Sequence, residues 1–123
     1  MNSFLPIFKA PALKRVGVLF WIAAPVVAYG GFAQSQPQTH RVRIDQIQFQ
    51  PAVIHAKVGD WIVFKNEDIV PHTASSRPNS GLKFESGTLQ NGQSFSVRLK
   101  SKGKFSYYCR FHLMMKGEIE VSQ

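Results

Sequence analysis

The chain of 123 residues contains one cysteine, Cys109, so it cannot close a disulfide within itself. It also has few acidic residues, seven against fifteen lysines and arginines. Beyond residue 33, no stretch shows a helical periodicity long enough to predict a substantial helix. These absences exclude an internally disulfide-linked fold and a helical bundle. They leave Cys109 as buried core, as a link between chains, or as a ligand.

The chain also lacks an apolar run long enough for a membrane-spanning helix. The run over residues 16–28 is shorter than the ~20 residues that a span needs, and Pro25 interrupts it. Basic residues precede this run, and the small residues Gly31 and Ala33 follow it. This layout predicts a secretory signal peptide over residues 1–33, cleaved after Ala33, rather than a retained anchor. The remaining residues 34–123 are expected to form one domain without stable membrane insertion.

Removal of the signal peptide would leave twelve lysines and arginines against seven acidic residues, a net charge of +5. Basic proteins of this size often bind nucleic acid. Here, however, the cations are scattered singly along alternating segments, and export separates the protein from nucleic acid. We therefore expect no nucleic-acid partner, and an acidic protein or anionic surface instead.

Apolar residues at every second position predict short β-strands with one buried face. The run Trp61-Ile62-Val63-Phe64 is apolar throughout and predicts a strand covered on both faces. Elsewhere, the predicted inward positions are Val42, Ile44, Ile47, Phe49, Phe95, Val97, Leu99, Phe105, Tyr107, Cys109, Ile119 and Val121. Seven to eight such strands in 90 residues predict an all-β fold, a two-sheet Greek-key β-sandwich.

Two dipeptides predict turns between these strands. Gly59-Asp60 is typical of a turn, and Asn91-Gly92 predicts a tight hairpin because both residues tolerate a positive φ. Between them, residues 69–75 alternate again and predict a strand on which His72 faces the core. Cys109 is expected to face the core at the end of another strand.

The segment from Cys109 to Met115 carries a thiol, an imidazole (His112) and a thioether, each three residues from the next. Thiolate and thioether are soft ligands, and together with imidazole they suit copper, whereas zinc would use more cysteine or histidine. One short loop cannot surround an ion, so a second imidazole must come from elsewhere. His72 is the best candidate because Pro71 stiffens the chain beside it.

The other histidines, His40 and His55, have no soft ligand nearby in the sequence and are expected to be bystanders. Two methionines, Met114 and Met115, could each be a weak axial ligand or an apolar cover. The residues alone leave that choice open.

Four segments together resemble a cupredoxin, a small blue copper protein. They are Pro71-His72-Thr73, Phe84-Glu85-Ser86-Gly87, Gly92-Gln93-Ser94-Phe95, and the motif Tyr108-Cys109-x-x-His112-x-x-Met115-x-Gly117. The spacing in the last is similar to the short ligand loop of amicyanin rather than the longer loops of plastocyanin, pseudoazurin or azurin. The resemblance implies one copper ion held by His72, Cys109, His112 and Met115, and it favours Met115 over Met114.

One residue departs from the pattern of the relatives. Thr73 follows the first histidine, where amicyanin and plastocyanin often have asparagine. The resemblance implies that the residue at this position helps tie the two ligand loops together. The departure therefore concerns the stiffness of the site and not its ligands.

The resemblance further implies a periplasmic type 1 copper protein that carries single electrons and is not an enzyme. The expected partners are redox proteins: a periplasmic dehydrogenase, a c-type cytochrome or an oxidase. His112 would be the electron port, within an apolar patch of Phe111, Leu113, Met114 and Pro71, and the protein would be a monomer. The surplus of cations would steer an acidic partner toward the site; it includes Lys100, Lys102 and Lys104 around one turn, with Arg110 and Lys116 flanking the copper loop.

A periplasmic copper carrier or storage protein is the main alternative, because the same ligands could serve delivery. A copper oxidase or reductase would need an open coordination position or further copper centres. The four histidines of the chain form no His-x-His pair that would suggest one.

Overall fold

The structure, a computed structural model, describes residues 12, 17, 22–27, 30–31 and 33–123. The chain divides into two units, Met1–Ala33 and Gln34–Gln123. The signal peptide predicted for residues 1–33 lies largely outside the described residues. Among those that are described, no helix has the length and apolar character needed to cross a bilayer.

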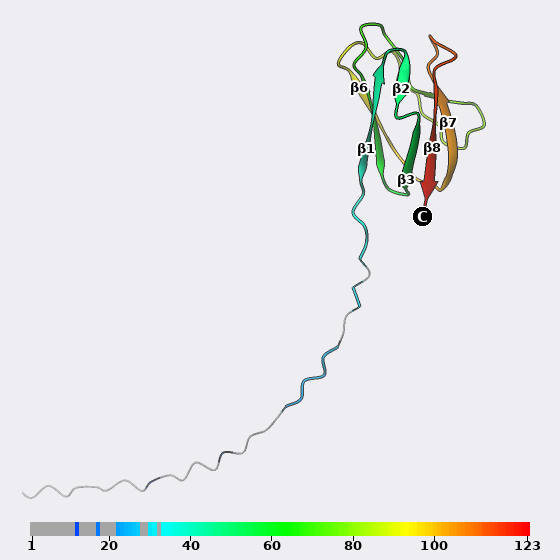
Figure 1. Ribbon diagram of the computed structural model, residues 1–123. Coiled ribbons are helices and arrows are strands. Elements are labelled where there is room, and N and C mark those ends of the chain that lie inside the picture. Colours follow the sequence, from blue (N-terminus) through cyan, green and yellow to red (C-terminus); the bar gives the residue numbers. More distant parts are fainter. Residues whose placement is uncertain (1–11, 13–16, 18–21, 28–29, 32) are drawn as a thin grey trace, which may run out of the picture. The chain divides into compact units, whose positions relative to one another are not determined.

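Gln34–Gln123 contains eight β-strands in two four-stranded sheets (Figure 1). The strands are β1 (Thr39–Asp45), β2 (Gln48–Gln50), β3 (Val53–Lys57), β4 (Trp61–Asn66), β5 (Ser75–Ser76), β6 (Ser94–Arg98), β7 (Gly103–Tyr108) and β8 (Lys116–Ser122). One sheet has the order β2-β1-β4-β6 and the other β3-β8-β7-β5. Both are mixed, because β1 pairs with β4 and β3 with β8 in parallel. The predicted all-β sandwich of seven to eight strands is confirmed.

The alternation predicted from the sequence places most core residues correctly. Val42 and Ile44 on β1 are fully buried, and so are Tyr107 on β7 and Ile119 on β8. Their side chains meet between the sheets in one apolar core. Cys109, just beyond β7, is also fully buried, as the parity of this strand predicts.

Two predicted core positions are wrong. Strand β4 is covered mainly on one face, since Ile62 and Phe64 are buried while Trp61 is 41% exposed. Ile47 is 49% exposed because it lies in a turn rather than on a strand. Gln46 and Ile47 form a two-residue hairpin between β1 and β2, both with positive φ. Two non-glycine residues in this conformation give no recognisable turn signal.

The hairpin predicted at Asn91-Gly92 is instead an isolated turn. Only Gly92 has a positive φ, and the turn is closed by the Gln93 N–H, which donates to the Gln90 carbonyl at 3.0 Å. It does not join two strands that pair with each other, because β6 pairs with β4. The turn predicted at Gly59-Asp60 does join β3 to β4, with Gly59 at φ 97°.

The strand predicted over residues 69–75 is mostly absent. His72 makes an isolated bridge to Leu89, and the following strand, β5, is two residues long. The four residues 72–75 are all buried, so the segment is covered on both sides and does not alternate. It runs between β7 and the 84–90 segment, and His72 is fully buried there.

An aromatic cluster fills the core beside the β7–β8 pair. The Tyr107 ring meets Phe49 and Phe64 edge to face, with centroids 4.7 and 5.1 Å apart. Directly opposite Tyr107 on β8 is Gly117, where a Cβ atom would overlap the Tyr107 ring. The ring therefore occupies the space that any other residue at position 117 would need.

Asp60 anchors the end of the sandwich where β1 begins. Its carboxylate accepts hydrogen bonds from the backbone N–H groups of Gln38 and Lys57 and from the His40 ring, at 2.8 to 3.0 Å. Burial raises the pKa of Asp60, but these hydrogen bonds outweigh it and leave the pKa below its ordinary value of 3.8. Ionised Asp60 is therefore favoured in the folded state.

Replacing Asp60 with asparagine is expected to lower the free energy of unfolding at pH 7 by about 2 kcal/mol, because it removes a buried charge that accepts several hydrogen bonds. This contribution is present above pH ~4 and is lost as the pH falls through the lowered pKa of the folded state. Urea unfolding at pH 7 and pH 3 would measure it. Asp45→Asn, at a more exposed site, is the control. If Asp60→Asn lowered the free energy of unfolding as much at pH 3 as at pH 7, the prediction would be wrong.

Candidate metal centre

Three nitrogen and sulfur donors converge at the end of the sandwich where β7 ends and β8 begins. Cys109 and His112 lie in the loop between these antiparallel strands, and His72 lies in the buried segment before β5. The His72 and Cys109 side chains are fully buried, whereas His112 is half-buried. The structure thus brings together residues 37 apart in the sequence.

The distances between these donors suit a metal ion. The Cys109 Sγ is 3.7 Å from Nδ1 of His72 and 3.8 Å from Nδ1 of His112, and the three donor atoms lie within 4.8 Å of one another. Metal bonds of ~2.0–2.1 Å to nitrogen and ~2.3 Å to sulfur, set at 120°, would separate the two donors by about 3.8 Å. Both imidazoles turn the same nitrogen toward the thiol, so the arrangement fits a shared ion.

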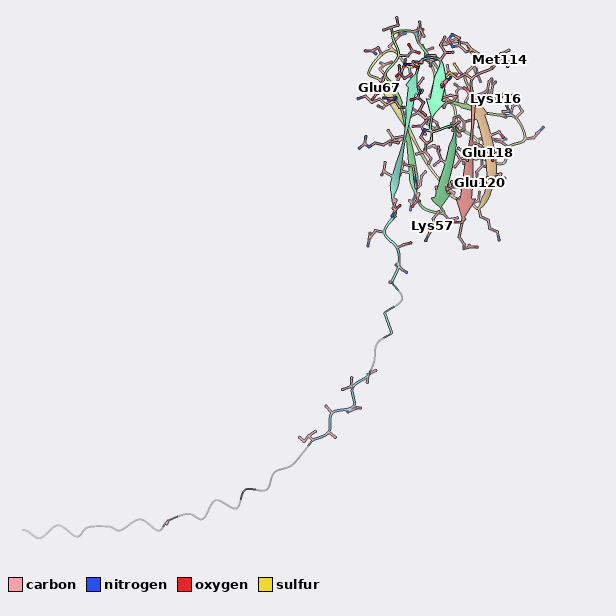
Figure 2. The ribbon with its side chains drawn as sticks, viewed as in Figure 1. Lys57, Glu67, Met114, Lys116, Glu118 and Glu120 are labelled. Carbon is pink, nitrogen blue, oxygen red and sulfur yellow. The ribbon has the colours of Figure 1, made fainter. Side chains whose placement is uncertain are left out.

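The two methionines lie in different surroundings. Met115 is 4% exposed and belongs to the core, whereas Met114 is 86% exposed (Figure 2). The backbone also fixes Met115, since its N–H donates to the His112 carbonyl at 2.8 Å and its carbonyl accepts from the Cys109 N–H at 3.0 Å. These bonds close the loop from Cys109 to Met115. Of the two thioethers, only that of Met115 is placed in the interior beside this loop.

A carboxylate that the sequence reasoning missed orients the first histidine. Asp68 Oδ2 lies 3.0 Å from His72 Nε2, and the Asp68 carboxylate also accepts hydrogen bonds from the Ile47 and Ile69 N–H groups. The Ile47 bond first, and then the His72 bond, lowers the pKa of Asp68. A proton on Nε2 leaves Nδ1 free as a ligand, which is how carboxylates commonly support metal-binding histidines. The sequence signal for this role was a carboxylate four residues before the candidate ligand His72.

Thr73 connects the two ligand segments although it replaces the asparagine common in relatives. Its hydroxyl accepts a hydrogen bond from the Arg110 N–H at 2.9 Å, and its own N–H points to Cys109 Sγ at 3.4 Å. The Thr73 hydroxyl also pairs with that of Ser75, which donates to Glu85, and Glu85 forms an ion pair with Arg110 at 2.8 Å. Thr73 therefore ties the segments together within a closed network.

Exposed apolar residues flank the half-buried His112 in the sequence. The ligand-loop patch, as we call Phe111, Leu113 and Met114, is at least 51% exposed at every position. Lys116 lies at the same end of the domain as Met114 (Figure 2). Lys100, Lys102 and Lys104, predicted around one turn, lie away from this site. They lie where β7 begins and pairs with the end of β8, while the ligand loop follows the opposite end of β7.

The remaining two histidines lie outside this centre. His40 lies on β1, with Nε2 2.8 Å from Asp60, and His55 on β3 lies 3.0 Å from Glu120. Among the described residues, the group of His72, Cys109 and His112 is the one cluster of three such donors close enough to hold a metal. The expectation that His40 and His55 are bystanders is consistent with these contacts.

A family model for the cupredoxin-like domain matches residues 14–121. The chain belongs to the cupredoxin family. Cupredoxins bind one copper ion, and the thiol, imidazole and thioether donors described above are the set that copper favours. The resemblance drawn from the sequence, and the copper that it implied, are thereby confirmed.

Among characterised proteins, this cupredoxin is similar to amicyanin-alpha of Methylorubrum extorquens, with 28% identity over 65% of this chain and 69% of that protein. It is also similar to the amicyanin of Paracoccus denitrificans, with 26% identity over 65% of this chain and 63% of that protein. The plastocyanin of Fritillaria agrestis is 35% identical over 62% of this chain and 53% of its own length. The chain thus spans between half and two thirds of the last two relatives.

Solved structures show the same fold. A purple cupredoxin from Nitrosopumilus maritimus matches with a TM-score of 0.62 and 26% identity, over 68% of this chain and 99% of that one. A copper-containing nitrite reductase from Thermus scotoductus matches with a TM-score of 0.67 and 26% identity, but over 72% of this chain and only 23% of the enzyme. The likeness to the enzyme is therefore confined to a cupredoxin domain.

Proposed function

We propose that this cupredoxin is a periplasmic type 1 copper protein that carries single electrons between redox proteins, with His72, Cys109, His112 and Met115 as its ligands. The observation that carries the proposal is the position of two imidazole Nδ1 atoms 3.7 and 3.8 Å from one buried thiol, with the buried Met115 at the end of the same loop. Copper would supply the one-electron couple between Cu(II) and Cu(I).

The surroundings of the ligands favour transfer of electrons over release of metal. His72 is fixed by Asp68, Cys109 by Thr73, and the loop by the bonds between Cys109 and Met115. A site that cannot rearrange keeps the same ligand positions in both oxidation states, which favours rapid electron exchange. A carrier or storage protein would instead benefit from ligands that detach easily.

His112 gives the site its route to the surface. It is the half-buried member of the set, and the ligand-loop patch of Phe111, Leu113 and Met114 surrounds it in the sequence. Exposed apolar side chains around one redox ligand suit the brief contacts of electron-transfer partners. A periplasmic dehydrogenase, a c-type cytochrome or an oxidase would dock there, and the protein would act as a monomer.

Protein-film voltammetry of the copper-loaded protein would test the proposal. An electron carrier should give one reversible one-electron couple that is unchanged after many cycles, with rapid self-exchange measured by NMR line broadening. A copper carrier should lose metal when reduced, seen as a decaying wave and as copper passing to a Cu(I) chelator. Loss of copper on reduction would contradict the proposal and favour delivery.

The two methionines give a matched pair of variants. Met115→Gln should lower the reduction potential, because a harder axial oxygen stabilises Cu(II) relative to Cu(I). Met114→Gln should change it much less, since Met114 is 86% exposed. Voltammetry of both variants measures the difference, and a larger shift for Met114→Gln would show that the axial assignment is wrong.

Because partners are proposed to dock at the ligand-loop patch, Leu113→Glu should slow electron transfer at every salt concentration. A charge at this position disrupts the contact itself. Lys116→Glu should slow the reaction chiefly at low salt, since the screening length falls from ~10 Å at 0.1 M to ~3 Å at 1 M. We choose Lys116 because Arg110 already pairs with Glu85. Stopped-flow rates with an acidic c-type cytochrome across an ionic-strength series would measure both effects.

Val58→Glu is the control for Leu113→Glu. Val58 is 40% exposed and follows β3 beside Lys57, which lies at the end of the domain opposite Met114 (Figure 2). The Val58→Glu substitution introduces the same charge as Leu113→Glu, but away from the ligand-loop patch. A loss of rate as large as that of Leu113→Glu at high salt would show that the patch is not the docking site.

A further inference from the structure

A groove of about 760 Å³ runs along β6, away from the ligand loop. It lies between this strand and the segment of residues 81–84. Eleven residues line it: Trp61, Gly81, Leu82, Lys83, Phe84, Phe95, Ser96, Val97, Arg98, Lys100 and Ser101. None of them belongs to the candidate metal centre, so the groove is a separate feature of the fold.

The floor of the groove is apolar without being closed. Four side chains pack against the core while remaining partly exposed, namely Leu82, Phe84, Phe95 and Val97, and all four line this groove. Phe84 stacks on Phe95 with centroids 6.2 Å apart, and Trp61 at the rim is 41% exposed. The partly buried apolar side chains that pack against the core cluster are thus gathered in one place.

Strand β6 is the edge of its sheet, since it pairs with β4 alone (Figure 1). The hydrogen bonds at the two ends of this pair, Leu99 N–H to the Asp60 carbonyl and Asn66 N–H to the Gln93 carbonyl, fix which residues of the strand face β4. By alternation, Ser94, Ser96 and Arg98 direct their backbone groups the other way. An edge with unpaired backbone groups is a template for another strand.

The charge along the groove has one sign. Lys83, Arg98 and Lys100 line it and no acidic residue does. None of the three cations forms an ion pair within the described part of the chain. The groove therefore combines an open strand edge, an apolar floor and three cations that lack an anionic partner.

Two occupants from this chain itself are disfavoured by that charge. The segment of residues 1–33 carries three basic residues and no acidic one. A second copy pairing through β6 would bring like charges of the two grooves together, which is how natural edge strands avoid self-association. The charge complementarity points to an anionic segment of another protein.

We propose that an extended acidic segment of a partner protein adds to β6 as a fifth strand of this sheet. The backbone of the segment pairs with Ser94, Ser96 and Arg98, as in other cases of strand addition. Its alternate apolar side chains cover the groove floor, and its carboxylates face Lys83, Arg98 and Lys100. This surface is distinct from the ligand-loop patch and does not depend on the proposed electron transfer.

The test uses the full-length protein labelled with ¹⁵N and two capped ten-residue peptides, one alternating valine with glutamate and one alternating valine with lysine. The glutamate peptide should shift the amide resonances of β6 and residues 81–84 in a saturable manner, and the lysine peptide should not. Lys100→Glu should weaken binding at least fivefold. Lys57→Glu, which changes the net charge equally but lies outside the groove, should weaken it less than twofold.

Backbone pairing is tested by Ser96→Pro, which removes an outward N–H that an edge strand can lose without breaking its own sheet. It should weaken binding at least tenfold with an unchanged circular dichroism spectrum. If this variant fails to fold, N-methylation of alternate amides of the glutamate peptide makes the same test on the other partner. The methylated peptide should then bind at least tenfold more weakly than the unmodified one.

Three outcomes would overturn the proposal. The first is the absence of saturable shifts in β6, and the second is equal weakening by Lys57→Glu and Lys100→Glu. The third is binding of dextran sulfate as tight as that of the peptide, with neither affected by Ser96→Pro, which would make the groove a general polyanion site. Because no readout involves electron transfer, failure here leaves the proposed function intact, and failure of the voltammetry leaves this test valid.

Discussion

Replacing Cys109 with serine is expected to abolish the intense visible absorption of the copper-loaded protein. The colour of a type 1 centre comes from charge transfer from thiolate to Cu(II), and Cys109 is the one cysteine of the chain. Its Sγ lies within 3.8 Å of both candidate imidazoles, so a hydroxyl there keeps the geometry but removes the soft donor. Absorption spectra, with copper content measured on the same samples, would test this.

His55→Gln is the matched control for this experiment. His55 is an exposed residue on β3 that pairs with Glu120 and does not belong to the three-donor cluster. The variant should keep full colour and one copper per chain. A colourless wild-type protein with one equivalent of Cu(II) bound would refute the type 1 assignment, whatever the variants do.

Replacing Gly117 with alanine is expected to lower the free energy of unfolding by about 2–3 kcal/mol. An added Cβ would overlap the Tyr107 ring, which is held in place by Phe49 and Phe64. The φ of Gly117 is not in the left-handed region, so the cost is steric and not conformational. Urea unfolding of the copper-free protein measures it, and the absorption of the copper-loaded variant reports whether the ligand loop is also displaced.

Tyr107→Phe separates the clash from other effects of the glycine. The Tyr107 hydroxyl is buried and has no hydrogen-bond partner among the described residues, so its removal alone should change stability little or improve it. Combined with Gly117→Ala, it should recover part of the lost stability, because the hydroxyl is one of the overlapping atoms. Strict additivity of the two substitutions would contradict the proposed contact.

Much of the fold was predictable because one physical pattern dominates this sequence. A strand with one buried face must alternate apolar and polar residues, and β1, β7 and β8 do so closely enough to place Val42, Tyr107 and Ile119. The same parity carried Cys109 into the core. Alternation is a local signal, so it predicted burial correctly where the chain forms a regular strand.

The errors arose where tertiary contacts override local preference. The hairpin at Gln46-Ile47 uses two residues that rarely adopt a positive φ, and no sequence pattern marks it. The segment that carries His72 is irregular because the 84–90 segment covers it, and its burial on both sides removes the alternation. Which strands pair, and whether in parallel, also depends on contacts between distant residues.

The candidate site was predictable in its donors but not in its support. The types and spacing of the residues from Cys109 to Met115 are chemically specific, and copper followed from them. The roles of Asp68 and Thr73 depend on hydrogen bonds that only the folded chain reveals. The preference for Met115 came from resemblance alone, and the burial of its side chain now gives it a physical basis.

The parallel pairing of β3 with β8 bears on how the protein folds and acquires its metal. Ile54 on β3 pairs with Ile119 on β8, so β3 can join its sheet only when β8 is present. Folds dominated by such distant contacts form in milliseconds to seconds, because the entropy cost of closing long loops comes before the strand pairing that offsets it. His72 and Cys109 become neighbours through the pairing of β5 with β7 in this same sheet, and His112 and Met115 lie in the loop between β7 and β8. The donor set therefore requires both of these strand pairings, and tight copper binding is expected only after this sheet has formed.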